Sequence, residues 1–372
     1  MESNLGEVKN NNRNRVLNLV RKTENITKPN VSKELGLSLP TAIQHMKELE
    51  ELGAIREGDV VGHTGGRRAK GYSLNENYRY AVGIELTLKE IVIIVVDFCG
   101  NQLAGEKFSC TLATDNNYYK MLGELLEQCL ERWSIDRERI IGVGIAVPGL
   151  VTDDFRKIYY GKPLGVGGVL AEDLGRYIPY PCHMYNNSDA AGYAEILGDE
   201  HCKDAVLIRL EKEIGGSVMI DGKVYRGENG KSGKVGHIQL IRGGEECYCG
   251  RRGCFNTLCN QKKLEAAGGG SVEDFFAKLG AGDDYCQRVW EDYLQSLAEG
   301  ITTLRMLFDS QVIIGGVIAD YIVPCFEKLV DKTRRLDPFD DPHTYLRISK
   351  IGRFAPALGS AEAMMNEYWE NF

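Results

Sequence analysis

The spacing of apolar residues changes near Tyr80 and divides the chain into two parts of different character. Before this point apolar residues recur at helical spacing, as Val16, Leu17 and Val20 do. After it, short apolar runs of strand length alternate with longer amphipathic segments. The strand-like runs include 81–88, 91–97, 140–147, 205–210, 216–220 and 311–314, and the helical segments include 116–133 and 290–306. This order predicts a helical head followed by an α/β body of two lobes.

We expect three domains that differ in charge. A helical head with a glycine- and arginine-containing linker is expected over residues 1–75, a first lobe over 80–190, and a second lobe with a cysteine-rich loop and a C-terminal helix over 191–372. Residues 1–80 hold 13 Lys and Arg against 10 Asp and Glu, whereas the rest of the chain holds 32 against 43. A mildly basic end on an acidic body is typical of a DNA-reading head on a ligand-binding trunk.

Residues 30–55 have the pattern of a helix-turn-helix. A short helix with Val31 and Leu35 facing inward is followed by a turn at Gly36 and by a longer helix that begins at Ser38. Ser38 is a favourable N-cap, and the proline two positions later falls in the first turn, where its missing N–H is harmless. Gly53 ends this second helix.

The second helix presents side chains that suit base and phosphate contacts. Its outward positions are Thr41, Ile43, Gln44 and Lys47, with His45 beside them. Glutamine pairs bidentately with adenine in the major groove, and lysine is better suited to phosphate. A small three-helix bundle that binds protein instead of DNA has the same pattern, so this alternative stays open from the sequence.

Two segments after the helix-turn-helix, 56–61 and 68–74, are expected to form a two-stranded wing. Between them, residues 64–70 combine glycines with three cations, among them Arg67 and Arg68. Small flexible residues with positive charge suit insertion into a minor groove. A plain linker would have a similar composition.

One group of residues has the composition of a metal site. His237 is followed by Cys247, Cys249 and Cys254 in a glycine-rich loop. One imidazole and three thiolates make a tetrahedral set suited to zinc, and a closed set of four protein ligands is structural because no position is left open for water. The sequence therefore predicts a structural zinc ion.

Other features concern the cellular compartment. The chain has no run of about 18 apolar residues, so no membrane span is expected. Its first residues lack the basic-then-apolar order of a secretion signal. We therefore expect a cytoplasmic protein whose 11 cysteines are mostly thiols or metal ligands.

These motifs resemble the ROK family of repressors, open reading frames and sugar kinases, over nearly the whole chain. The resemblance rests on 147–151, on Gly236 and His237, on the cysteine run 247–254, and on 314–316. It implies an actin-like ATPase (ribonuclease H-like) fold, zinc bound by His237 and the three cysteines, and a sugar cleft between the lobes. The head and the segment 65–67 resemble the repressor branch of the family.

The positions that serve catalysis in the family kinases are altered. Where those kinases have the Asp that takes the sugar hydroxyl proton, this chain has Asn187, and a neutral amide is no general base. The first phosphate loop lacks its glycines, and the second, 209–216, carries Glu211 and Glu213, which repel polyphosphate. We therefore expect the body to lack kinase activity.

The resemblance also places the sugar contacts, at Asn186, Asn187, Lys234, His237 and Asn256. Lys234 and Asn256 each stand where the family has Glu. Two acceptors are lost and a cation is gained, which favours a ligand with a carboxylate or phosphate. A site drifting without selection, or a lysine turned to solvent, is the alternative.

Together these features predict a sugar-responsive transcriptional regulator, most simply a repressor. Its head would bind a DNA operator and its body a carbohydrate or sugar derivative. A two-fold operator would require a homodimer or homotetramer. The alternatives are an ATP-dependent sugar kinase with a head attached, and a regulator that acts only through protein contacts.

Overall fold

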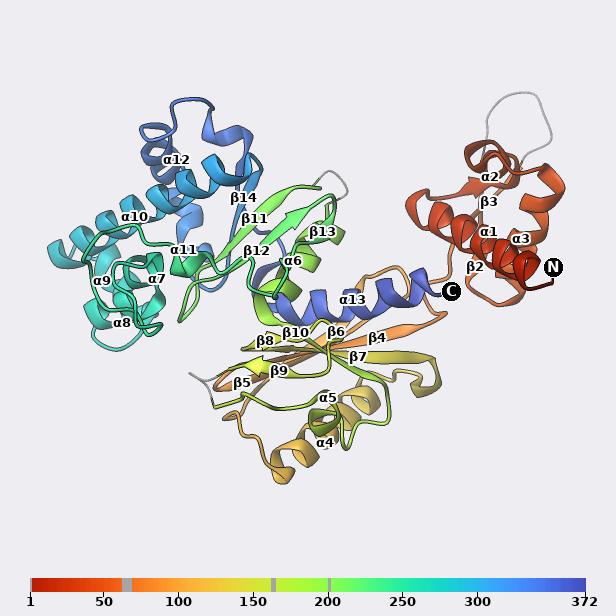
Figure 1. Cartoon of the computed structure of the whole chain (residues 1–372), viewed down its shortest axis with the longest axis horizontal. Helices are drawn as coiled ribbons and strands as arrows, with labels where there is room; N and C mark the ends of the chain where they lie inside the picture. The colour runs from red at the N-terminus through yellow and green to blue at the C-terminus, as the bar shows by residue number, and fades with distance from the viewer. Residues whose placement is uncertain (1, 62–68, 162–164, 200–201) are drawn as a thin grey trace.

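The computed structural model describes residues 2–61, 69–161, 165–199 and 202–372. It shows a small head and a body built on two separate sheets (Figure 1). In the described part of the chain, no helix is long and apolar enough to cross a membrane.

The head is a winged helix-turn-helix, as the sequence predicts. Its elements are α1 (Glu2–Lys22), β1 (Ile26–Thr27), α2 (Lys28–Leu35), α3 (Leu39–Glu51), β2 (Ile55–Val61) and β3 (Ala69–Leu74). The two predicted wing strands are β2 and β3, which pair with each other. The short strand β1 pairs with the other edge of β3 and completes a three-stranded sheet.

Local chemistry fixes the two ends of the turn in the head. Gly36 ends α2 in the left-handed conformation, with a φ of 64° that a side chain would disfavour. Ser38 then caps α3, because its hydroxyl accepts a hydrogen bond from the backbone N–H of Thr41. Val31 and Met46 are fully buried where α2 and α3 meet.

The first lobe is built on a five-stranded sheet of order β10-β7-β4-β5-β6. Its elements are β4 (Tyr80–Leu86), β5 (Glu90–Val96), β6 (Gln102–Ser109), α4 (Asn116–Arg132), β7 (Ile140–Val147), β8 (Leu150–Val151), β9 (Ile158–Tyr160), α5 (Ala171–Leu174) and β10 (Cys182–Asn186). Strand β4 is antiparallel to β5 and parallel to β7.

The second lobe repeats this topology in a sheet of order β13-β12-β11-β14-β15. Its elements are α6 (Asn187–Leu197), β11 (Ala205–Arg209), β12 (Gly215–Ile220), β13 (Lys223–Val224), α7 (Phe255–Cys259), α8 (Gln261–Gly268), α9 (Val272–Gly280), α10 (Asp284–Phe308), β14 (Gln311–Gly315), α11 (Ala319–Ile322), α12 (Phe326–Arg334), β15 (Leu346–Ile348) and α13 (Ala355–Glu370). The duplicated sheet confirms the predicted two-lobed, actin-like body.

Side chains on the two faces of each sheet pack into different hydrophobic cores. On β4, Val82 and Ile84 pack with Leu122 and Leu126 of α4 on one face of the first sheet. The opposite face is covered by α13. In the second sheet, one face packs against α10, and the other packs against α6. Helices α6 and α13 contact each other and lie between the two sheets (Figure 1).

The C-terminal helix differs from the expected domain division. We expected it in the second lobe, over 191–372, but α13 lies on the first sheet and crosses back from the second lobe at Ala355. The physical reason is a row of small residues. A Cβ at Gly83 or Gly144 would overlap the backbone carbonyl of Ala357 or Ser360, so only glycine lets the helix backbone come this close.

The end of α13 also holds the head. The guanidinium of Arg21 lies 3.8 Å from the ring centre of Trp369, and an Nη of Arg13 donates to the carbonyl of Phe372 at 2.8 Å. A charge over an indole face and a hydrogen bond to the chain end fix α1 to the last turn of α13. The head therefore contacts the body through the helix that covers the first sheet (Figure 1).

We expect Gly144→Ala to destabilise the body by about 1–3 kcal/mol, the usual range for overpacking. The added methyl group would overlap the carbonyl of Ser360 and push α13 off the sheet. The matched control is Gly280→Ala, because Gly280 ends helix α9 with no atom within 4 Å of an added Cβ. Thermal melts followed by circular dichroism should show a lower Tm for the first variant and an unchanged or higher Tm for the second.

Candidate DNA-binding face, metal centre and ligand cleft

Helix α3 exposes most of the side chains that were expected to contact DNA. Ile43 is 40% exposed, the Lys47 side chain is 70% exposed, and Gln44 is also exposed. Thr41 is half-buried in the first turn. Arg67 and Arg68 lie outside the described residues.

His45 departs from the prediction. It is only 3% exposed and lies on the same face of α3 as Ala42 and Leu49, which are fully buried. Its Nδ1 is 3.3 Å from Oε2 of Glu48. The helical spacing of 42, 45, 46 and 49 is that of an inward-facing stripe, so His45 packs in the core of the head.

The exposed polar side chains of α3 are held by weak local pairs. Gln44 donates to Glu48 at 3.1 Å, and Lys47 lies 3.4 Å from a carboxylate oxygen of Glu51. Exposed pairs of this kind contribute about 0.3–0.5 kcal/mol each. A phosphate or base edge could displace them at little cost.

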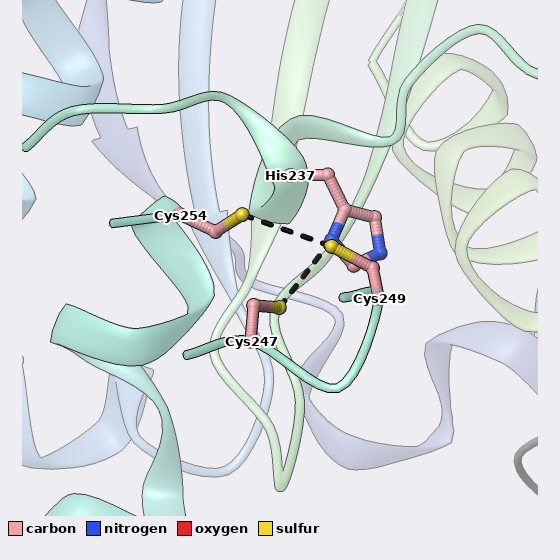
Figure 2. Close-up of side chains that lie close together, drawn as sticks. All are labelled: His237, Cys247, Cys249 and Cys254. Carbon is pink, nitrogen blue, oxygen red and sulfur yellow. Dashed lines mark hydrogen bonds between the residues drawn. The ribbon is translucent and has the colours of Figure 1, made fainter. Parts of the chain in front are cut away.

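The predicted metal ligands come together in one cluster. The ligand atoms of His237, Cys247, Cys249 and Cys254 all lie within 4.8 Å of one another (Figure 2). Sγ of Cys249 is 3.8 Å from Sγ of Cys254, and Sγ of Cys247 is 3.7 Å from Nδ1 of His237. Zinc–sulfur bonds of about 2.3 Å at tetrahedral angles place two sulfurs about 3.8 Å apart. The donor set therefore fits a four-coordinate metal ion.

The imidazole of His237 is oriented for this role. Its Nδ1 faces the sulfur atoms, and its Nε2 lies 3.1 Å from the hydroxyl of Tyr248. Burial, and then the nearby guanidinium of Arg251, lower the pKa of His237, so the neutral form that a metal requires is favoured. The remaining ring nitrogen is occupied by a neighbour in the same loop, as in many metal sites.

Asn186, one of the expected ligand contacts, serves the fold. Its side-chain oxygen accepts from the backbone N–H groups of Ser188 and Asp189 and so caps α6. Its Nδ2 donates to the carbonyl of Gly149 at 2.8 Å. Asn186 thereby ties the Pro-Gly turn after β7 to the start of α6.

Lys234 has a counter-ion within the chain. Its Nζ is 3.4 Å from Oδ1 of Asn186 and 3.9 Å from Oδ1 of Asp189. Asp189 is buried and also lies 3.9 Å from Nε of Arg226. Burial raises the pKa of Asp189, while first Lys234 and then Arg226 act to lower it. Asn186 and Asp189 thus both face the ammonium group of Lys234 from within the chain.

The other two amides differ from each other. Asn256 is buried, and its Oδ1 accepts from the backbone N–H of Ile214 at 2.6 Å while its Nδ2 donates to Glu213 at 2.5 Å. Asn187 donates to the carbonyl of Leu86 at 3.3 Å, but its buried Oδ1 has no donor among the described residues.

The segments that the resemblance aligns with the two phosphate loops of the family kinases, 83–88 and 209–216, hold an ion pair. Arg209, at the end of β11, lies 3.1 Å from Oε1 of Glu211 and 3.6 Å from Oε1 of Glu85 on β4. Burial raises the pKa of Glu85 to about 7, although Arg209 acts to lower it. The space beside Arg209 is lined by the carboxylates of Glu195 and Glu211, by 315–316 and by the guanidinium of Arg353.

Sequence reasoning missed several of these side chains. Arg226 contacts Asp153 at 3.1 Å and lies over the ring of Phe155, and it also donates to the carbonyl of Val151. Nothing in the local sequence marks it, since its partners are about 70 positions away. Tyr248 lies between Cys247 and Cys249 of the cluster, and that position could have drawn attention to it.

Comparison with known proteins places the chain in a family. The ROK family model matches residues 81–367, and a winged helix-turn-helix DNA-binding model matches residues 9–56. The DNA-binding transcriptional dual regulator NagC of Escherichia coli K12 is 25% identical over 379 residues, covering 95% of this chain and 93% of that protein. The xylose repressor of Bacillus subtilis strain 168 is 22% identical over 370 residues, covering 97% and 96%.

Solved structures share the fold. A ROK family transcriptional regulator described as a homologue of the E. coli MLC protein has a TM-score of 0.78 at 21% identity and covers 96% of both chains. The ROK hexokinase of Thermus thermophilus has a TM-score of 0.65 at 25% identity, covering 78% of this chain and 99% of its own. The kinase thus matches in nearly its full length and leaves about a fifth of this chain unmatched. The chain belongs to the ROK family and carries a winged helix-turn-helix DNA-binding head.

Proposed function

We propose that the protein is a transcriptional repressor that binds an operator through α3 and its wing and responds to a carbohydrate. The observation that carries this proposal is the head itself, a winged helix-turn-helix with Ile43, Gln44 and Lys47 exposed on α3. This head is fixed to a ROK body by α13. Both regulators named above align with nearly the whole of this chain, including the head.

The body acts as a sensor and not as a kinase. The residue at the catalytic position, Asn187, has no carboxylate to accept a proton. The phosphate-loop positions are occupied by Glu85, Arg209 and Glu211, in which one guanidinium is shared between two acidic side chains. A nucleotide would have to displace a buried ion pair and approach two carboxylates.

The ligand is a carbohydrate whose hydroxyl groups are read by the cleft. The unpaired Oδ1 of Asn187 provides an acceptor for a hydroxyl. Asp189 balances Lys234 and so removes the need for an anionic group, which favours a neutral sugar. Repressors of this family named for N-acetylglucosamine and for xylose support the same class of ligand.

Zinc holds the loop that carries His237. The four ligand atoms are spaced for a tetrahedral ion, and the set is closed, so zinc is structural. The loop continues into α7, where Asn256 bonds to Glu213 and Ile214 beside the cleft. Loss of the metal should therefore disturb the cleft as well as the loop.

A homodimer or homotetramer would place two heads on a two-fold operator. Half-sites lie about one helical turn, roughly 34 Å, or a multiple of it apart. Ligand binding that favours a different lobe arrangement would change the relative placement of the two heads. When the ligand shifts the population toward that arrangement, the two heads no longer fit the two half-sites and the protein releases the operator.

Replacing Lys47 with Ala should weaken binding to all DNA sequences and lower the salt slope by about 1, since one phosphate contact is lost. Gln44→Ala should instead relax sequence preference. The matched control is Lys120→Ala on α4, another exposed lysine with an i,i+4 glutamate. Binding is measured by fluorescence anisotropy on a duplex that the protein selects from a random pool. A regulator acting only through protein contacts would select no duplex.

A thermal-shift screen should show a higher Tm with one class of neutral sugar, because a ligand that binds only the folded state stabilises it by mass action. The panel contains N-acetylglucosamine, xylose, glucose, sugar acids, sugar phosphates and ATP. Asn187→Ala should reduce the shift, since it removes the acceptor. A shift with ATP together with a neutral hexose would instead support the kinase alternative.

The variant Cys249→Ser should lose most of its bound zinc and respond less to the ligand, because the loop beside the cleft is no longer held. Cys99→Ser is the control, since Cys99 is also an exposed free thiol but lies outside the cluster. Zinc is measured by atomic absorption and the response by the ligand-dependent Tm. A zinc-depleted variant with an unchanged ligand response would show that the metal does not support the cleft.

A further inference from the structure

A buried ion pair joins the two sheets of the body. Arg209 belongs to β11 of the second lobe and Glu85 to β4 of the first, and their side chains are only 10% and 6% exposed. The guanidinium lies 3.6 Å from Glu85 and 3.1 Å from Glu211, so it is shared between a carboxylate of each lobe. Because the partners are held on different sheets, relative movement of the lobes changes this contact directly.

On the side of the second lobe, Glu211 is connected to the loop that bears the metal cluster. The backbone carbonyl of Glu211 accepts from the N–H of Gln261 at 3.0 Å. Asn256, two positions after Cys254, holds the neighbouring Glu213 and Ile214. The segment that carries Glu211 is thereby attached at several points to α7 and to the start of α8.

On the side of the first lobe, Glu85 is connected to the head. Glu85 and Gly83 lie on one face of β4, because side chains two residues apart in a strand point the same way. Gly83 is the position at which α13 comes into backbone contact with the strand. The other end of α13 holds α1 through Trp369 and Phe372.

We propose that Glu85, Arg209 and Glu211 form an interlobe latch that passes the arrangement of the lobes to the DNA-binding head through β4 and α13. With the latch closed, the lobes and α13 are held in the arrangement that binds the operator. A ligand that favours another lobe arrangement opens the latch and repositions α13. This inference rests on the proposed function for its consequence at DNA, and the latch itself is tested separately from it.

The electrostatics of the latch allow two discrete states. A buried ion pair that loses one partner leaves an uncompensated charge, which is strongly unfavourable. Glu85 can avoid this cost by taking up a proton. Burial raises its pKa to about 7, and Glu211 and Glu90 act in the same direction. Arg209 acts to lower the pKa. When Arg209 moves away, the carboxyl group takes up a proton and is tolerated without its partner.

The test compares Arg209→Met and Glu85→Gln with the wild type as full chains, without ligand. Glu85→Gln preserves shape and the pair between Arg209 and Glu211, which guards against simple misfolding. The matched control is Glu106→Gln, on strand β6, whose partner Arg132 on α4 also lies within the first lobe. Circular dichroism and zinc content confirm that each variant is folded.

Hydrogen exchange by mass spectrometry is the first readout. Both latch variants should exchange at least about threefold faster than the control, in the β4 and β11 segments and also in α13 and α1. Faster exchange confined to the 205–216 segment in both variants would overturn the proposal, because the effect would then be local. So would profiles equal to those of the control.

Operator affinity is the second readout. On a duplex selected by the wild type, both latch variants should bind at least about fivefold more weakly, the lower end of usual allosteric coupling. Affinities within twofold of the control would overturn the proposed coupling to the head. If the wild type selects no duplex, the proposed function fails, and hydrogen exchange alone still decides whether the latch connects the lobes to α1.

Discussion

The close packing of α13 on the first sheet is the contact on which the arrangement of the molecule depends. Because glycines at 83 and 144 let the helix backbone touch β4 and β7, α13 can cover the sheet, contact α6 and still extend to the head. Ser360 secures the approach by donating to the carbonyl of Gly144 at 3.0 Å. One helix therefore belongs to the core of the first lobe and to the support of the head at once, so a shift of the helix cannot be confined to either part.

In the candidate cleft, charged side chains pair with one another at the positions where the resemblance to the family kinases places catalysis. Catalysis needs an unpaired base and a cradle of backbone donors for phosphate. Here the cations and carboxylates at the corresponding positions satisfy each other, as Lys234 does with Asp189 and Arg209 with Glu85 and Glu211. An amide such as that of Asn187 can accept a hydrogen bond from a hydroxyl but cannot remove its proton at neutral pH. Binding survives such changes more readily than reaction does.

Structural features that depend only on neighbouring residues could be predicted from the sequence. Features that depend on residues far apart in the chain could not. The cap at Ser38, the turn at Gly36 and the cysteine run each need only neighbouring residues, and the structure has all of them as expected. The return of α13 to the first sheet depends on contacts more than 200 positions apart, such as that between Gly144 and Ser360. His45 was expected among the DNA contacts, but the helical spacing puts it beside Ala42 and Leu49, and the structure buries it.

The interpretation of Lys234 depends on partners that the sequence alone does not show. A lysine at a position where the family has glutamate suggests an anion-binding site when the ligand is the only partner of that lysine considered. In the structure the partner is Asp189, which the capping of α6 by Asn186 brings to the same place. Lys234 in turn bonds to that capping residue, so the substitution is absorbed into the polar network that starts the helix. A charge change in a buried site thus indicates a new ligand only after the counter-ions within the chain have been accounted for.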